Sequence, residues 1–269
     1  LKMRIAFSTI IGLVLGLGLL TYAVIGGEPT VYFQFFQPAG LGIVLGGTLA
    51  ATMVSYEGRY VWKALGTLLQ VVGATSINSK SLFGTVELVI GWGRVGAKEG
   101  IAALESEFAK VDTEKDPFLH HCIQLFLAGY DKENLRGKLD TFISSSYQRN
   151  MVRASILNTM ANVAPAFGML GTLIGLVMML ASLDASDPSS LGTSLSVALL
   201  TTLYGTLFAQ LLFKPASRRA EQKEQIARFK NQLTAEGFLL LISQANSVEI
   251  QDHLNSFLDP AIHFDSAKS

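Results

Sequence analysis

Small residues and hydroxyls recur at helical spacing inside two long apolar segments of the chain. One set comprises Pro165, Gly168, Thr172 and Gly175. The other comprises Ser194, Ala198, Thr202, Gly205 and Ala209. Residues three or four apart share one side of an α-helix, so each set forms a stripe. Because hydroxyl oxygens suit a hard cation such as sodium, the two stripes could line an ion path.

Ordinary helix packing is the alternative explanation of both stripes. Small residues let the backbones of membrane helices approach closely, and hydroxyls form hydrogen bonds across the contact. Pro165 lacks a backbone N–H and can bend its helix, although proline is also tolerated in membrane helices. Tyr204 lies in the second segment, where its ring could pack and its hydroxyl could bond to another helix. The residues alone leave these explanations open.

Neither segment contains Asp, Glu, Lys, Arg or His. A proton carrier normally places an Asp or Glu within its membrane span, because some group must bind and release the ion. This chain cannot do so alone. Either it moves no ion, or a helix of a partner protein supplies the acid.

Other patterns that could carry chemistry are weak. His120, His121 and Cys122 are consecutive, and neighbours on a helix point about 100° apart, so they cannot easily share a metal ion. The glycine-rich stretches near the N-terminus lack the Lys-Ser/Thr pair of a phosphate-binding loop. The sequence suggests no Ser-His-Asp arrangement. We therefore expect no enzyme, no metal site and no resident cofactor, and the single cysteine excludes an internal disulfide.

The composition is that of a membrane protein. Only 16% of the 269 residues are charged and the mean hydropathy is +0.38, whereas about a quarter of the residues of a soluble domain are charged. A helix needs about 20 apolar residues to cross a bilayer. Four charge-free stretches reach that length: residues 5–25, 31–56, 161–183 and 192–213.

The positive charges are placed asymmetrically. The connections 26–30 and 184–191 contain no Lys or Arg, whereas residues 57–160 contain twelve and the tail after residue 213 contains seven. Since Lys and Arg mark cytoplasmic segments, both termini are expected in the cytoplasm. We predict an all-α integral membrane protein with four transmembrane helices and a large helical cytoplasmic insertion between the second and third.

This topology divides the chain into four parts. The expected parts are transmembrane helices 1 and 2 (1–56), a cytoplasmic helical domain (57–160), transmembrane helices 3 and 4 (161–213) and a cytoplasmic C-terminal helix with its tail (214–269). Within the insertion, apolar residues of 118–127 follow a period near 3.6, and Asp131 is placed to cap a following helix. Because Lys plus Arg equals Asp plus Glu at 21 each, nucleic acid is not expected as a partner. Membrane lipid is expected as a partner of the apolar stretches.

Two segments closely resemble known membrane spans. Residues 162–180 (NVAPAFGMLGTLIGLVMML) and 197–216 (VALLTTLYGTLFAQLLFKPA) resemble spans three and four of the flagellar stator A subunit, the MotA/PomA family within the MotA/TolQ/ExbB superfamily. Residues 116–129 (DPFLHHCIQLFLAG) and 100–105 (GIAALE) resemble cytoplasmic motifs of the same family. Spans one and two agree only in topology.

The resemblance implies a stator subunit of an ion-driven rotary motor in the bacterial inner membrane. In that family five A subunits surround a dimer of MotB/PomB-like B subunits, and each B subunit supplies a membrane helix with an essential Asp. Ion flow turns the A ring and generates torque on the flagellar rotor. This fits a chain whose own spans lack an acid. An ExbB/TolQ-like force transducer of the cell envelope is the alternative, although such chains usually have three spans.

The resemblance also implies roles for individual residues. Pro165 and Pro215 match the prolines of span three and of the end of span four, and Pro215 and Tyr204 are assigned structural or gating roles. Thr172 matches a position that is typically Thr in sodium-driven stators and Ala in many proton-driven ones. Thr202 matches the second hydroxyl of the ion path. Sodium is therefore favoured over protons as the transported ion.

The motif that faces the rotor protein FliG departs from the family pattern. Glu105 matches the acidic contact residue, but Ala97 stands eight residues earlier, where the family usually has Arg. Lys98 and Arg94 are close enough in sequence to replace it, since surface charge pairs are loose in geometry. Apart from the resemblance, these charges would be interpreted as a solvated helix face.

Overall fold

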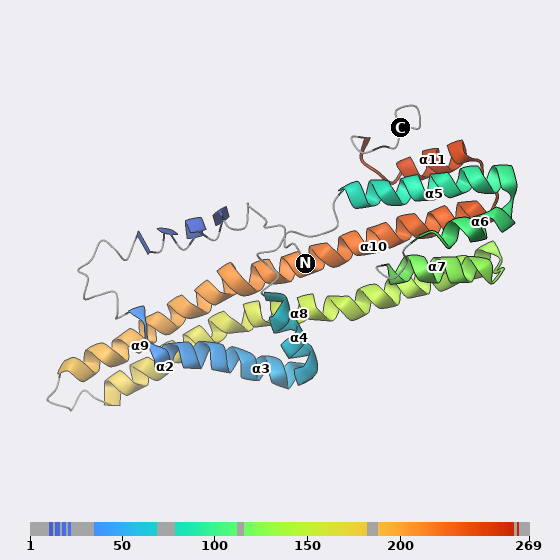
Figure 1. Cartoon of the computed structure of the whole chain (residues 1–269). Helices are drawn as coiled ribbons and strands as arrows, with labels where there is room; N and C mark the ends of the chain where they lie inside the picture. Colours follow the sequence, from blue (N-terminus) through green and yellow to red (C-terminus); the bar gives the residue numbers. More distant parts are fainter. Residues whose placement is uncertain are drawn as a thin grey trace. The chain divides into compact units, whose positions relative to one another are not determined.

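The computed structural model describes residues 11–12, 14–16, 18–19, 21–22, 35–68, 79–111, 116–181, 188–260 and 263. Regular structure in these residues is helical throughout, and the helices belong to two compact units (Figure 1). The first unit combines residues 1–75 and 151–222, and the second combines 76–150 and 223–269.

Three helices in the described part of the chain are long and apolar enough to cross a membrane: Pro38–Ser55, Lys132–Ala181 and Leu191–Ile242. The prediction of an all-helical membrane protein is confirmed to this extent. The first expected span, residues 5–25, lies largely outside the described residues. A fourth crossing, expected at residues 5–25, and the placement of the insertion therefore stay predictions.

Within the described residues, the helix of the second expected span begins at Pro38. Its helix consists of α2 (Pro38–Leu41), a π-helical turn (Gly42–Gly46) and α3 (Gly47–Ser55). Gln37 precedes it in an extended conformation, with φ −110° and ψ 101°. Pro38 fixes the start, because proline at the first helical position has the φ of a helix and needs no N–H partner there. The stretch 31–56 rests on hydropathy alone, which does not register this start signal.

The third and fourth expected spans are parts of longer helices. α8 (Lys132–Ala181) runs for 50 residues from its predicted start after Asp131, whose carbonyl accepts a hydrogen bond from Leu135 N at 2.9 Å. Residues 138–164 contain neither glycine nor proline. No helix-breaking residue therefore interrupts the helix between its start after Asp131 and the apolar span. α9 (Pro188–Leu207) likewise continues through a π-helical segment (Phe208–Phe213) into α10 (Lys214–Ile242).

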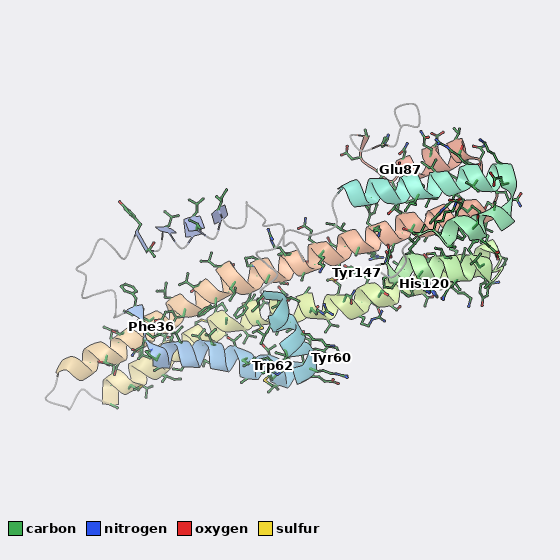
Figure 2. The ribbon with its side chains drawn as sticks, viewed as in Figure 1. Phe36, Tyr60, Trp62, Glu87, His120 and Tyr147 are labelled. Carbon is green, nitrogen blue, oxygen red and sulfur yellow. The ribbon has the colours of Figure 1, made fainter. Side chains whose placement is uncertain are left out.

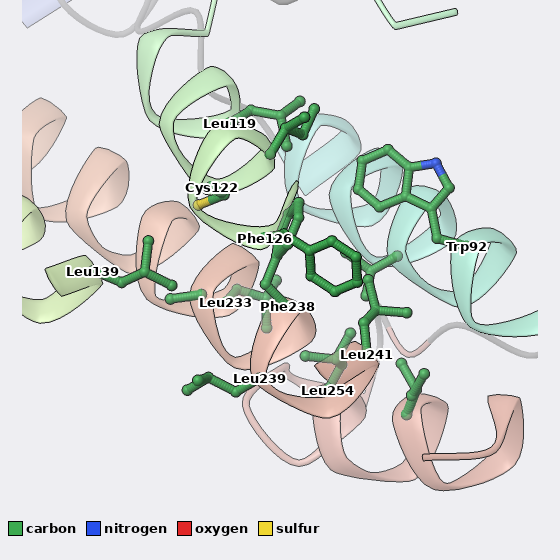
Figure 3. Close-up of a cluster of buried hydrophobic side chains, with 14 of the residues drawn as sticks. Trp92, Leu119, Cys122, Phe126, Leu139, Leu233, Phe238, Leu239, Leu241 and Leu254 are labelled. Atoms are coloured by element: carbon green, nitrogen blue, oxygen red, sulfur yellow. The ribbon is translucent and has the colours of Figure 1, made fainter. Parts of the chain in front are cut away.

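The second unit is organised around a cluster of aromatic rings. It contains α5 (Ser79–Glu99), α6 (Ile101–Phe108), α7 (Pro117–Leu127), α11 (Ser247–Asn255) and the adjoining parts of α8 and α10. Trp92 lies 4.9 Å from Phe108 between ring centroids, and Phe126 lies 5.5 Å from Phe108, both edge to face. Figure 3 shows Trp92, Phe126 and Phe238 in this cluster. Such pairs add about 0.5–1.5 kcal/mol each beyond the burial of their area.

Asp116 connects the start of α7 to α10 within this unit. One carboxylate oxygen accepts a hydrogen bond from Leu119 N at 3.1 Å and so caps α7, while the other forms an ion pair with Lys230. Pro117 occupies the first turn, where its missing N–H costs no hydrogen bond. A single side chain therefore satisfies the helix start and joins two helices.

Replacing Asp116 with Ala is expected to lower the free energy of unfolding of the second unit by about 1–2 kcal/mol, because a capping residue is lost. Asp116→Asn keeps an acceptor for Leu119 N but loses the charge opposite Lys230, so its effect should be smaller. Denaturant unfolding is monitored through Trp92 in a Trp62→Phe background, where Trp92 is the only indole of the two in the chain. Equal effects of Ala and Asn would contradict the capping role.

Candidate ion path between two membrane helices

Glycines bring the backbones of α8 and α9 into contact within the first unit. A Cβ atom on Gly168 would lie 2.9 Å from Thr201 O, and one on Gly175 would lie 2.7 Å from Ala198 N. From the other helix, a Cβ on Gly205 would lie 2.7 Å from Ala164 O. Real Cβ atoms essentially never come within 3.0 Å of such atoms. Only glycine therefore fits at these three positions.

Thr172 and Thr202 meet across this contact. Their Oγ1 atoms are 2.6 Å apart, and Thr172 Oγ1 also lies 3.1 Å from Gly168 O and 3.2 Å from Ala198 O. Thr202 Oγ1 lies 3.4 Å from the same Gly168 O. Two hydroxyls and two backbone carbonyls thus place four oxygens together. Oxygen is the ligand type that hard cations prefer.

The two prolines occupy different settings. Pro165 lies inside α8 at the glycine contact, because a Cβ on Gly205 would be 3.2 Å from Pro165 Cα. Pro215 is the second residue of α10, directly after the π-helical segment Phe208–Phe213. The structure therefore places Pro165 at the glycine contact, seven residues before Thr172, and Pro215 beyond the π-helical segment.

Tyr204 both packs and forms hydrogen bonds. Its side chain is buried, and its hydroxyl accepts a hydrogen bond from Gln37 N at 2.9 Å and donates one to Phe35 O. Gly40, in the first turns of α2, packs against the same side of α9, since an added Cβ would lie 3.1 Å from Thr201 Cγ2. Tyr204 thus anchors the beginning of α2 to α9, while a gating role stays a prediction.

Three buried threonines of the first unit were not singled out from the sequence. Thr201 Oγ1 lies 2.9 Å from Val197 O, Thr48 Oγ1 lies 2.6 Å from Val44 O, and Thr52 Oγ1 lies 2.7 Å from Thr48 O. Each hydroxyl bonds a carbonyl of its own helix, which leaves its methyl group for packing. The four-residue spacing of Thr48 and Thr52 is the signal that could have indicated a shared buried face.

The predicted rotor contacts lie in the second unit. Arg94 and Lys98 are exposed in the last turns of α5, and Glu105 is exposed on α6. Gly100 joins the two helices with φ +81°, a conformation that favours glycine. Among the described residues, none of the three charged side chains forms an ion pair.

The consecutive His120, His121 and Cys122 point to different surroundings. His121 stacks on Phe142 at 4.9 Å, and His120 Nε2 lies 2.9 Å from Gln124 Nε2. Cys122 is fully buried, and burial together with the charge of Asp116 raises the pKa of its thiol well above the ordinary value. Within the described ranges, no three His, Cys, Asp or Glu side chains come together as metal ligands.

Residues 110–232, which contain the threonine pair and both prolines, match the MotA/TolQ/ExbB proton channel family. Motility protein A of Borreliella burgdorferi is 32% identical over 235 residues, which cover 84% of this chain and 87% of that protein. The chain belongs to the MotA/TolQ/ExbB family. It is therefore a multi-pass membrane protein of a channel family without catalytic activity.

Two further matches extend over nearly the whole MotA-like chain. The uncharacterised protein YtxD of Bacillus subtilis is 32% identical over 255 residues, covering 94% of this chain and 91% of that protein. The structure of the flagellar MotAB stator complex from Bacillus subtilis superposes with a TM-score of 0.80 at 22% identity, covering 95% of this chain and 97% of that chain. The second match establishes a shared fold.

Gly205→Ala is expected to force α8 and α9 apart and destabilise the MotA-like chain, because the new Cβ would lie 2.7 Å from Ala164 O. Gly192→Ala on the same helix is the matched control, since nothing lies within 4 Å of its added Cβ. The control should be neutral or slightly stabilising, because Ala is favoured over Gly in helices by about 1 kcal/mol. Thermal unfolding of both purified variants distinguishes them, and equal stability would contradict the close contact.

Proposed function

We propose that this chain is the A-type subunit of a flagellar stator, which forms an ion path with a B-type partner and converts ion flow into torque on the rotor. The contact of Thr172 with Thr202 carries the proposal. It provides an oxygen-lined position on two apolar helices, yet residues 161–183 and 192–213 contain no Asp, Glu, Lys, Arg or His. An ion path there requires an acid from another helix.

A MotB/PomB-like dimer is the partner that supplies this acid, with five copies of the A subunit around it. Exposed apolar side chains on α8 and α9 support the proposal that other subunits cover these helices. Leu173, Val177 and Leu199 are all at least 60% exposed in the isolated chain. Surfaces this apolar are covered by lipid or by protein in a membrane. The assembly lies in the bacterial inner membrane, with both termini in the cytoplasm and residues 57–160 and 214–269 forming the cytoplasmic parts.

Sodium is the proposed ion. A proton needs only the partner's carboxylate, whereas a sodium ion needs several oxygens. Thr172 Oγ1, Thr202 Oγ1 and Gly168 O lie within 3.4 Å of one another and can supplement a single carboxylate. Pro165 and the glycines beside it support this role by holding the two helices at the required separation.

The cytoplasmic contact with the rotor protein FliG is assigned to Lys98, Glu105 and Arg94. All three are exposed and lie on consecutive helices joined at Gly100. Because Ala97 offers no charge, Lys98 or Arg94 provides the basic member of the contact. These three side chains form no ion pair among the described residues. A partner's charges can therefore pair with them without breaking an existing ion pair.

Thr172→Ala is expected to reduce swimming speed at limiting sodium while leaving membrane insertion intact, because one ligand oxygen is lost. Speed is measured against sodium concentration at fixed pH, in a stator-less host that carries this chain and its B-type partner. Ser196→Ala is the matched control, since within the described residues Ser196 Oγ bonds only Gly192 O of its own helix, at 2.9 Å. Removing one of several oxygen ligands should shift the half-maximal sodium concentration upward several-fold.

Unchanged speed of the Thr172→Ala strain across the sodium range would remove Thr172 from the ion path. A swimming speed that does not depend on sodium concentration but is lost with a protonophore would show that the transported ion is a proton. Failure of the unmodified chain to restore swimming, with both proteins inserted, would favour an ExbB/TolQ-like force transducer.

Charge reversal at the rotor contact tests the cytoplasmic assignment separately. Lys98→Glu and Glu105→Lys are each expected to lower torque without changing ion passage, because they act on rotor pairing alone. Tethered-cell rotation measures torque, and ion uptake through a complex with an opened B subunit measures passage. Lys138→Glu, on an exposed lysine of the same unit, is the control. Full torque in both single variants and in the double variant would contradict the assignment.

A further inference from the structure

The short helix α4 (Gly58–Leu68) is amphipathic and lies against the first unit by one face. Val61 and Ala64 are fully buried, and Ala64 belongs to the apolar cluster that includes Ile156 and Phe213. This face is therefore occupied by the protein itself. The other face is available to the surroundings.

Arg59, Trp62 and Lys63 form this outer face, because residues three and four apart are neighbours on a helix. We name these three residues the α4 outer face. Trp62 is 62% exposed (Figure 2), whereas the only other tryptophan, Trp92, is 3% exposed in the core of the second unit. An exposed indole is typical of the boundary between lipid tails and water, where its apolar ring and polar N–H are both satisfied.

The chain places α4 at such a boundary. α3 is the end of a helix that is long and apolar enough to cross a membrane, and only Tyr56 and Glu57 separate its last residue from α4. Two residues reach at most about 7 Å. Val54, in the last turn of α3, is 90% exposed, so a lipid-facing surface leads directly to the α4 outer face.

The two basic residues of this face differ in their ion pairing. Arg59 Nε lies 2.5 Å from Glu57 Oε2, and its guanidinium covers the Tyr60 ring at 4.8 Å. Lys63, in contrast, forms no ion pair with any residue in the described ranges. The pair Glu57–Arg59 is neutral as a whole, which leaves the charge of Lys63 as the net charge of the helix surface.

We propose that the α4 outer face binds an anionic phospholipid headgroup, with Lys63 on the phosphate region and Trp62 at the boundary of the acyl chains. This adds a lipid site to the proposed function without depending on ion flow. Only the assignment of the site to the cytoplasmic leaflet rests on the proposed topology.

Quenching of Trp62 fluorescence tests the lipid site directly. The full chain with Trp92→Phe, in which Trp62 is the only indole, is reconstituted in vesicles of phosphatidylcholine and phosphatidylglycerol. Either lipid carries brominated acyl chains, at the same mole fraction. Brominated phosphatidylglycerol should quench more strongly than brominated phosphatidylcholine. Because Trp92→Phe alters the core of the second unit, the unmodified chain is compared with Trp62→Phe, which should lose the quenching.

Two substitutions should change this lipid preference in opposite directions. Lys63→Gln should lower the preference for phosphatidylglycerol about five-fold, the effect of one basic residue near an anionic surface. Glu57→Gln should raise it, because Arg59 is released from its ion pair. Lys138→Gln is the matched control, since Lys138 is exposed in the second unit, over the Tyr130 ring at 4.7 Å.

Three results would overturn the proposal. Equal quenching by the two brominated lipids would show that Trp62 meets the membrane without selecting charge. Absence of quenching by either lipid would show that water or another copy of the chain covers the face. If neither Lys63→Gln nor Glu57→Gln changed the preference for phosphatidylglycerol, the charges of Lys63 and Arg59 would not be its cause. Each result leaves sodium-dependent swimming, and therefore the proposed function, to be judged independently.

Discussion

The close approach of the α8 and α9 backbones is the constraint on which the candidate ion path depends. In a membrane no hydrophobic force pushes helices together, so packing and hydrogen bonds must hold them. Gly168 and Gly205 remove the side chains that would keep the backbones apart. The short side chains of Thr172 and Thr202 can meet at 2.6 Å only because of that approach. The oxygen cluster is thus a consequence of the glycines.

The same helix α9 holds a second neighbour by a different means. Tyr204 supplies the hydrogen bonds that join Phe35 O and Gln37 N to α9, at the point where α2 begins. A helix start leaves backbone N–H groups without partners, and here a buried phenol satisfies one just before the first turn. Thr202 meets Thr172 of α8. Thr201 lies against both neighbours, since a Cβ added to Gly171 of α8 or to Gly40 of α2 would contact its side chain.

The sequence anticipated features that depend on local spacing. The stripes of Thr172 and Thr202 follow from helical periodicity, and the helix start after Asp131 follows from capping chemistry. Features set by distant contacts were not predictable. The burial of Thr48 depends on neighbours outside its own helix. The unbroken course of α8 through residues 160–161 is local in origin, because residues 138–164 contain no glycine or proline that would stop the helix. The roles of Lys98 and Glu105 need a partner that neither the sequence nor the fold contains.

The irregular end of the apolar part of α9 has a local cause. In a regular α-helix the ring of Pro215 would collide with the carbonyl of Leu211, four residues earlier. Leu211 lies within the π-helical segment Phe208–Phe213, whose wider turn displaces that carbonyl. Lys214, the first charge after the apolar run, then reaches Asn158 Oδ1 on α8 at 2.8 Å. Lys214 is one of the seven basic residues after residue 213 on which the predicted cytoplasmic placement of this end rests.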